Sequence, residues 1–294
     1  MKKVLIIGID SFTGTYLKSY LEKYDFDVYG TAYSYNSDRI YRCDISKKNE
    51  IKDILNSIKP MYIINLAAIS FVGNSNKEIF YQVNVLAVEN ILDSLLEIEN
   101  YIPKKTILVS SATVYGNQDE NILDESMSPN PVNHYGISKL AMEQISKNYF
   151  GKLDIIITRP FNYTGVGQGE HFLIPKIVKH FKEKKDVIEL GNLDVSREFN
   201  DVEFVCEVYK KLLECDYNST IVNVCSGRGI KLLDVIDIMN NISDYKIEIK
   251  VNSSFVRKDE IKCLTGSSKK LFEMIGYVQQ KEFKDTLKNM YKDK

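Results

Sequence analysis

The stretch "VLIIGIDSFTGTYL", from Val4 to Leu17, contains the motif that decides the fold. An apolar run typical of a buried strand ends at Gly8, and Gly14 follows six residues later, at the start of a helical pattern. In such a unit the first glycine permits a sharp turn and the last lets the helix pack against the strand. We therefore predict a turn that binds the pyrophosphate of a dinucleotide, with Ser11 in place of the middle glycine as phosphate donor or helix cap. A tight turn without a ligand is the alternative.

Apolar runs and helical patterns alternate outward from this turn over the first two thirds of the chain. The runs are rich in Ile, Val and Leu, as in strands buried on both faces. The predicted strands are Val4–Ile7, Val28–Ala32, Tyr62–Leu66, Thr106–Ser110 and Ile155–Thr158, and the predicted helices are Tyr16–Lys23, Glu50–Ile58, Phe80–Glu97 and Lys139–Tyr149. This alternation predicts an α/β fold with a Rossmann-type, doubly wound parallel sheet and right-handed crossovers.

Bulk composition argues against several classes of partner. Of the 294 residues, 44% are hydrophobic and 27% are charged, as in an ordinary globular protein of one or two domains. The net charge of −1 gives no general attraction to nucleic acid or to an anionic membrane. No stretch approaches the length of a membrane span, and the N-terminal apolar run is too short for a signal peptide. We expect a cytoplasmic protein with no nucleic-acid partner and no membrane partner.

The cysteines and histidines show no metal-binding pattern. The five cysteines form no CxxC pair, and the three histidines are scattered along the sequence. We expect reduced, structural cysteines and no metal site.

The segment after the second predicted strand bears on the choice of dinucleotide. An acidic residue at the end of this strand normally binds the adenosine ribose of NAD, and "DVYGTAYSYNSDR" (27–39) has none there. A missing acid with an arginine nearby favours NADP, so we predict NADPH as the cofactor, with NAD as the alternative. Arg39 is predicted to face the 2′-phosphate; otherwise it is a solvated charge in the loop.

Two further motifs supply candidate catalytic residues. "SSATVYG" (110–116) lies at the end of the fourth predicted strand, and "NHYGISK" (133–139) begins a helix. Tyr135 and Lys139 are four residues apart and share a helix face, where an ammonium group lowers the pKa of a neighbouring phenol. Such a tyrosine can exchange a proton with a sugar or alcohol oxygen near neutral pH. A serine hydroxyl at the strand end could hold the same oxygen.

These motifs resemble those of the extended short-chain dehydrogenases/reductases that modify nucleotide sugars, and the resemblance covers nearly the whole chain. Further matching stretches are "RCDIS" (42–46), "NLAAISFV" (65–72), "VNVLAVENIL" (83–92) and "RPFNYTGVGQ" (159–168). The resemblance implies that Ser111, Tyr135 and Lys139 are catalytic. Together with the motif analysis, it implies these cofactor-binding residues: Gly8, Ser11, Phe12, Gly14, Arg39, Asp44, Ile45, Leu66, Ala67, Ala68, Tyr135 and Lys139.

The resemblance also implies how substrate is bound. Ser111 and Asn162 occupy positions at which the family contacts the sugar nucleotide. Arg197 and Arg257 are candidates for its diphosphate, because arginine forks match phosphate oxygens. The alternatives are a salt bridge from Arg197 to an acid such as Asp201, and a surface role for Arg257.

The strand–helix alternation loosens after about Pro160. We expect residues 1–165 to form an NADP-binding Rossmann domain, with later strands woven back into it at about 190–226. Residues 166–294 are expected to form mainly a smaller α/β cap that binds substrate. His171, in the loop before the first helix of this cap, could contact substrate or lie on the surface. The family resemblance further implies a homodimer through Phe80–Glu97 and the helix that begins near Lys139.

Three reactions compete within the family: 4,6-dehydration, epimerisation and reduction. Dehydratases carry an acid where this chain has Ala112 and Thr113, so dehydration is disfavoured. "SATVYG" also resembles UDP-hexose 4-epimerases, but these usually carry the acid after the second strand that this chain lacks. The stretches "GNLDVSREFNDVEFV" (191–205) and "VNVCSGRG" (222–229) are similar to the GDP-4-keto-6-deoxy-D-mannose reductases.

The expected activity is therefore NADPH-dependent reduction of the C4 keto group of a nucleotide-linked 4-keto-6-deoxy sugar. The specific expectation is conversion of GDP-4-keto-6-deoxy-D-mannose to GDP-D-rhamnose. The alternatives are a nucleotide-sugar 4-epimerase with tightly bound NAD, a reductase of another GDP- or dTDP-4-keto sugar, and a non-enzymatic NADP-binding protein. The nucleotide base, the sugar length and the C4 stereochemistry of the product stay open.

Overall fold

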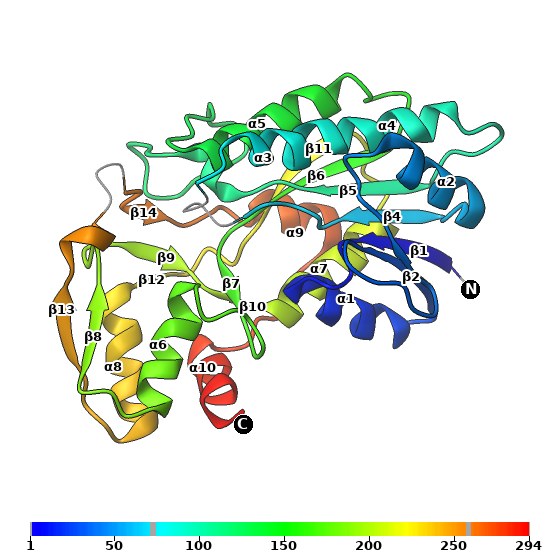
Figure 1. Ribbon diagram of the computed structural model, residues 1–294. Helices are drawn as coiled ribbons and strands as arrows, with labels where there is room; N and C mark the ends of the chain where they lie inside the picture. The colour runs from blue at the N-terminus through cyan, green and yellow to red at the C-terminus, as the bar shows by residue number, and fades with distance from the viewer. Residues whose placement is uncertain (1, 71–74, 257–259, 294) are drawn as a thin grey trace.

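A seven-stranded parallel sheet forms the centre of the molecule (Figure 1). The computed structural model describes residues 2–70, 75–256 and 260–293. In spatial order the strands are β11 (Thr220–Val224), β6 (Ile155–Pro160), β5 (Lys105–Val109), β4 (Tyr62–Asn65), β1 (Lys2–Ile7), β2 (Phe26–Ala32) and β3 (Ile40–Arg42). The chain winds outward from β1 in both directions, so the doubly wound α/β fold is confirmed. The carboxyl ends of β1 and β4 meet at the switch point where such sheets bind ligands.

Both faces of the sheet are covered by helices, as its apolar strands require. On one face lie α1 (Phe12–Glu22), α7 (Val202–Glu214) and α9 (Lys269–Ile275); on the other lie α2 (Lys48–Ile58), α4 (Ala87–Glu97) and α5 (His134–Lys147) (Figure 1). Alternate residues of β1 enter opposite cores, since Val4 and Ile6 pack in the first and Leu5 and Ile7 in the second. The sheet therefore fixes the positions of loops that follow its strands.

The predicted helix Phe80–Glu97 is present but is not a uniform α-helix. It consists of α3 (Glu78–Tyr81), a π-helical turn η1 (Gln82–Leu86) and α4. Asn84, in the π turn, is fully buried, and its amide group donates to Ile69 O and to Ser138 Oγ. In the described part of the chain, the helical stretch Glu78–Glu97 has the length and apolar composition of a membrane span, which the sequence analysis did not expect. Half of it is buried inside the molecule, as in a core helix.

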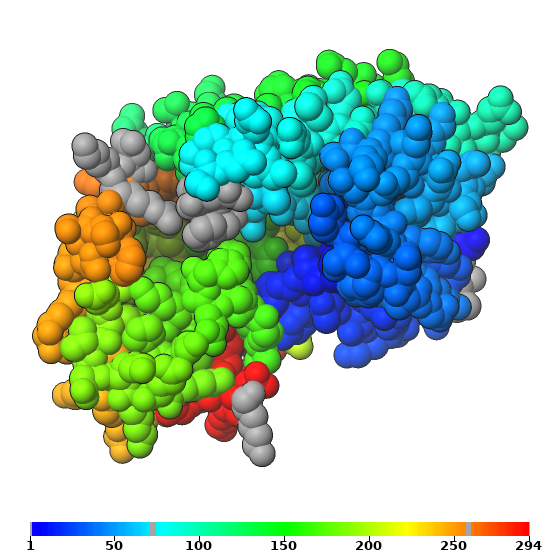
Figure 2. All heavy atoms as spheres, viewed as in Figure 1, coloured from blue at the N-terminus to red at the C-terminus, as the bar shows by residue number. Residues whose placement is uncertain are grey.

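A second, smaller core lies beyond the carboxyl edge of the sheet. Its helices are α6 (Leu173–Lys182), α8 (Leu232–Ser243) and α10 (Phe283–Lys292), and its strands are β8 (Val187–Leu190) and β13 (Glu248–Val251). We call this part the cap. Two further short sheets are β7 (Tyr163–Thr164) with β10 (Asn200–Asp201), and β9 (Ser196–Glu198) with β12 (Gly229–Lys231) and β14 (Cys263–Leu264). The short helix η3 (Ser253–Phe255) packs on the cap, where Lys176 Nζ lies 4.6 Å from the ring centroid of Phe255. The surface is hollowed where the cap meets the sheet domain (Figure 2).

Candidate active site

A cavity of about 910 Å³ lies between the carboxyl edge of the sheet and the cap. Nine of the site residues expected from the sequence line it: Ser11, Phe12, Leu66, Ala68, Ser111, Tyr135, Lys139, Asn162 and Arg197. The expected residues Gly8, Gly14, Arg39, Asp44, Ile45 and Ala67 are not part of its wall. Arg257 lies outside the described residues. The cavity therefore brings together the glycine turn, the Ser–Tyr–Lys set and part of the expected substrate site.

The glycine turn has the geometry of a dinucleotide cradle. Gly8 has a φ of +82°, a conformation that favours glycine, and a Cβ at Gly14 would lie 2.5 Å from the Gly8 carbonyl oxygen. Ser11 acts as the helix cap, because its hydroxyl accepts from Gly14 N–H and donates to Gly8 O. The first turn of α1 contains no acidic residue, so its N-terminal dipole favours an anion in the cavity. The turn fits a pyrophosphate, with Ser11 in the capping role.

The structure does not place Arg39 at the cofactor edge. Its guanidinium forms an ion pair with Asp27 and lies over the ring of Tyr29, and both partners precede the carboxyl end of β2. Arg42 instead ends β3 and pairs in register with Ala32, the last residue of β2. Arg42 is exposed at this edge. Its place at this edge could not be predicted from the sequence, because β3 spans only three residues and has no strand pattern of its own.

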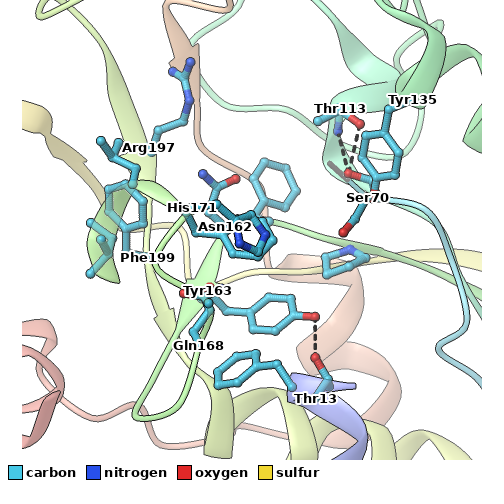
Figure 3. Close-up of a pocket in the computed structure, with 18 of the residues that line it drawn as sticks. Thr13, Ser70, Thr113, Tyr135, Asn162, Tyr163, Gln168, His171, Arg197 and Phe199 are labelled. Atoms are coloured by element: carbon cyan, nitrogen blue, oxygen red, sulfur yellow. Dashed lines mark hydrogen bonds between the residues drawn. The ribbon is translucent and has the colours of Figure 1, made fainter. Parts of the chain in front are cut away.

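Ser111, Tyr135 and Lys139 all line the cavity. Figure 3 shows Tyr135 beside Thr113 at its edge. Ser111 follows β5 and caps the short helix η2 (Ala112–Tyr115), while Tyr135 and Lys139 lie on the first turns of α5. Lys139 is buried, and its Nζ donates to Val109 O at 2.7 Å. Asn133 caps α5 by accepting from Gly136 N–H, which fixes the start of the helix.

The electrostatics differ from the expectation that Lys139 lowers the pKa of Tyr135. Burial raises the pKa of Tyr135 to about 12, and a hydrogen bond with Ser111 is what opposes this rise. Burial lowers the pKa of Lys139 to about 8, against the opposing charge of Glu143. Tyr135 is therefore protonated at neutral pH and suited to donate a proton.

A buried ion pair supports this wall from behind. Glu143 lies one turn after Lys139 on α5 and is fully buried. Its carboxylate accepts from Arg159 Nε at 3.0 Å and Nη2 at 2.7 Å, and from Ser110 Oγ at 2.5 Å. The Arg159 guanidinium also lies 4.7 Å from the ring centroid of Tyr115. Charge-assisted, bidentate pairs of this kind hold the ends of β5 and β6 and the helix α5 in fixed register.

Residues that the sequence analysis did not single out orient the same helix and the glycine turn. Ser138 Oγ donates to Tyr135 O and accepts from the buried Asn84, so the π turn braces the first turn of α5. On the opposite side, the hydroxyl groups of Thr13 and Tyr163 are 2.8 Å apart and join the glycine turn to β7 (Figure 3). Only the position of Tyr163 within "RPFNYTGVGQ" hinted at such a role.

The cap supplies the remaining wall of the cavity. Arg197 lines it, but its Nη2 lies 2.7 Å from Glu260 Oε1 and its Nη1 donates to Lys262 O at 3.1 Å. The salt bridge given as the alternative to diphosphate binding is thus present, with Glu260 as the partner in place of Asp201. Asn162 and His171 also line the cavity, and the His171 ring lies 4.2 Å from that of Phe172.

The strand that carries Arg197 is anchored by a buried carboxylate. Glu198 is fully buried and accepts from the backbone N–H groups of Ser226 at 2.7 Å, Gly227 at 3.2 Å and Gly266 at 2.6 Å. These bonds tie β9 to the loop after β11 and to the segment after β14. Hydrogen bonds to an ionised group are stronger than neutral ones, so the anchor is firm.

Carboxylates are few among the described residues of the cavity wall. Among the described residues that line it, the carboxylates are Asp10 in the glycine turn and Glu260, which pairs with Arg197. Next to Ser111 stand Ala112, which is buried, and Thr113, whose hydroxyl donates to Ser111 Oγ. The described wall therefore has no carboxylate beside the Ser–Tyr pair to remove a carbon-bound proton.

Comparison with known proteins identifies relatives along the whole chain. A family profile described as GDP-mannose 4,6 dehydratase matches residues 5–290. The chain is 36% identical to GDP-6-deoxy-D-talose 4-dehydrogenase of Aggregatibacter actinomycetemcomitans over 275 residues, covering 93% of this chain and 91% of that protein. It is 26% identical to GDP-6-deoxy-D-mannose reductase of Pseudomonas aeruginosa over 308 residues, covering 99% and 97%. The structure of RMD from Pseudomonas aeruginosa complexed with NADPH aligns with a TM-score of 0.88 at 25% identity, covering 99% of this chain and 98% of that one.

Proposed function

The chain belongs to the nucleotide-sugar-modifying family that the GDP-mannose 4,6 dehydratase profile describes, and from this premise we propose that it reduces the C4 keto group of a GDP-linked 4-keto-6-deoxy hexose with NADPH. One observation carries the proposal: Ser111, Tyr135 and Lys139 line the cavity together, and burial raises the pKa of Tyr135 to about 12. A protonated phenol is the acid that reduction of a ketone requires. The described wall has no carboxylate beside it that would serve dehydration.

The residues divide the chemistry as follows. The glycine turn and the N-terminus of α1 hold the pyrophosphate, and bound NADPH supplies the hydride that adds to C4. Tyr135 donates its phenolic proton to the C4 oxygen, and Ser111 donates a hydrogen bond to the same oxygen. Lys139, buried on the next turn of α5, provides positive charge beside the phenolate that Tyr135 becomes.

The preference for NADPH is supported at the end of the second strand, where the sequence has no acidic residue for a ribose 2′-hydroxyl. We assign the 2′-phosphate to Arg42, since it stands at the carboxyl ends of β2 and β3, while Arg39 is paired with Asp27. The relative crystallised with NADPH supports the same cofactor.

Two products compete, and they differ only in the configuration of C4. The sequence stretches 191–205 and 222–229 favour GDP-D-rhamnose, made from GDP-4-keto-6-deoxy-D-mannose. The 36% identity to a GDP-6-deoxy-D-talose 4-dehydrogenase favours the C4 epimer, GDP-6-deoxy-D-talose. The face of the ketone that meets the nicotinamide decides between them.

The proposal also covers location and assembly. We propose a cytoplasmic enzyme, because its substrate and cofactor classes are made there, and a homodimer that pairs the surfaces of η1 and α5. Leu86 on η1 is 53% exposed and Ile137 on α5 is 41% exposed. The dimer rests on the family resemblance, and burial of these two apolar side chains would favour it.

The test is a stoichiometric assay with GDP-4-keto-6-deoxy-mannose. We expect one NADPH consumed per sugar reduced, and we expect the Tyr135→Phe variant to lose about 10²–10⁴-fold in turnover while its affinity for NADPH is unchanged. NMR of the product assigns C4 by its ring-proton couplings. Tightly bound NAD in the purified protein, with interconversion of C4 epimers and no net NADPH consumption, would instead identify an epimerase.

A further inference from the structure

We propose that Thr113 is a positioning residue that fixes the hydroxyl of Ser111 as a hydrogen-bond donor toward Tyr135 and the C4 oxygen. The inference rests on the proposed C4 chemistry and adds a residue to it. Thr113 donates twice to Ser111 Oγ, from its backbone N–H at 3.2 Å and from its own Oγ1 at 2.9 Å (Figure 3).

The hydrogen-bonding capacity of the Ser111 hydroxyl decides which role it can take. A serine hydroxyl has one proton and two acceptor lone pairs, and normally rotates to suit its partners. At Ser111 both lone pairs are occupied by Thr113, so the proton is the capacity that remains. Ser111 lines the cavity together with Tyr135. Its hydroxyl therefore serves as a donor on that side and cannot accept there.

The direction of this bond matters because both reacting oxygens become more negative during reduction. The C4 oxygen gains negative charge as hydride adds, and Tyr135 becomes a phenolate when it gives up its proton. The single proton of Ser111 serves one of these oxygens at a time, and a hydroxyl already held as a donor on this side needs little reorientation during the reaction, which is the property of an effective oxyanion site. The hydrogen bond of Ser111 acts in this sense, because it opposes the burial that raises the pKa of Tyr135.

One of the two bonds has an ordinary structural explanation and the other does not. The bond from Thr113 N–H is the cap of η2, which Ser111 would make with any residue at 113 except proline. The bond from Oγ1 requires a hydroxyl at position 113. Valine has nearly the shape of threonine and lacks only this donor, so Thr113→Val isolates it, and Thr113→Ser restores it.

The experiment measures kcat and both KM values for Thr113→Val, Thr113→Ser, Ser111→Ala and the double variant Ser111→Ala/Thr113→Val. Loss of one orienting hydrogen bond predicts a fall in kcat of about tenfold for Thr113→Val, with both KM values unchanged within about twofold. Thr113→Ser should keep turnover within about twofold of the wild type. The double variant should be no slower than Ser111→Ala, because Thr113 acts only through Ser111.

Three results would overturn the inference. Wild-type kcat in Thr113→Val would show that the second bond is not needed. An equal loss in Thr113→Ser would show that the shape of residue 113 matters and its hydroxyl does not. A further loss in the double variant would show that Thr113 contacts substrate directly.

Failure of the proposed function is seen separately, in the wild type. The wild type could fail to reduce the 4-keto sugar and instead oxidise or epimerise a nucleotide sugar at C4. In that case the same four variants are compared in the observed reaction, because Ser111 would face the C4 oxygen there too. A wild type that neither reduces the 4-keto sugar nor oxidises or epimerises a nucleotide sugar at C4 would overturn both the proposed function and the role of Thr113.

Discussion

At the scale of single residues, Lys139 serves the proposed reaction but its buried charge lowers the free energy of unfolding. Only 3% of its surface is exposed, and burial lowers its pKa to about 8 from an ordinary value of 10.5. Below pH 8 the folded protein must hold a charge that the unfolded chain leaves in water. This cost is fully present below about pH 8 and disappears as the pH rises from 8 toward 10.5.

We therefore expect Lys139→Met to be inactive yet more heat-stable than the wild type at pH 7. The melting temperature should rise by about 2–4 °C for each kcal/mol recovered. The difference between the two proteins should shrink as the pH is raised from 8 toward 10.5. Scanning calorimetry at several pH values measures this difference, with Lys284→Met, at an exposed position of α10, as the matched control. A destabilised Lys139→Met protein at pH 7 would contradict this account.

At the scale of the element, the turn between β1 and α1 depends on close backbone contact. In an ordinary helix, glycine to alanine is favourable by about 1 kcal/mol. At Gly14 the new Cβ would lie 2.5 Å from Gly8 O and 2.6 Å from Ile9 O, and these backbone atoms cannot move independently. The steric cost, about 1–3 kcal/mol, should exceed the gain in helix propensity.

We expect Gly14→Ala to lower both the melting temperature and the affinity for NADPH, because α1 must move away from β1 and carries its N–H groups with it. Thermal melts and fluorescence titration with NADPH measure the two effects. Ser19→Ala, at an exposed position of the same helix, should change neither. An unchanged NADPH affinity in Gly14→Ala would mean that the turn does not hold the pyrophosphate.

Elements with a strong local pattern could be predicted from the sequence, and those set by distant contacts could not. All five predicted strands are present, because continuous Ile, Val and Leu runs are typical of strands between two helical layers. β3 has only three residues, and pairing with β2 stabilises it more than its own pattern does. Because β3 was not predicted, no sequence pattern placed Arg42 beside the end of the second strand.

The candidate site also combines residues that the sequence predicts with features that only the structure reveals. Ser111, Tyr135 and Lys139 follow from motif spacing, and the structure places all three on one cavity wall. The brace from Asn84 to Ser138 joins residues 54 positions apart, and a polar residue in an apolar helix gives no sign of its partner. The pKa of Tyr135 could not be predicted either, because it is set chiefly by burial, which raises it, and by the hydrogen bond with Ser111, which lowers it.

At the scale of the whole molecule, the surface formed by η1 and α5 bears on assembly. Leu86 and Ile137 are exposed there, and Tyr81 and His134 lie nearby with Tyr81 OH 3.0 Å from His134 Nδ1. Burying such side chains contributes about 25 cal/mol per Å² of apolar surface. A homodimer through this surface would cover them.

We expect light scattering to give the mass of a dimer for the wild type and of a monomer for Leu86→Glu/Ile137→Glu. A charge introduced into a buried apolar contact is strongly unfavourable, so the double variant should separate at micromolar concentration. Leu233→Glu, at a position of the cap that is 44% exposed, is the matched control and should stay dimeric. A monomeric wild type would contradict the proposed dimer.

The order of strands in the sheet has a consequence for synthesis on the ribosome. β11 pairs with β6, but Thr220 is translated long after Pro160, and the segments that begin the cap come between them. Until β11 has left the ribosome, β6 is an open edge strand whose backbone groups can pair with another nascent chain. The first part of the cap, which includes α6 and β8, must therefore be synthesised before β11 can complete the sheet, and slow translation between residues 160 and 220 would lengthen the period in which the edge of β6 is open.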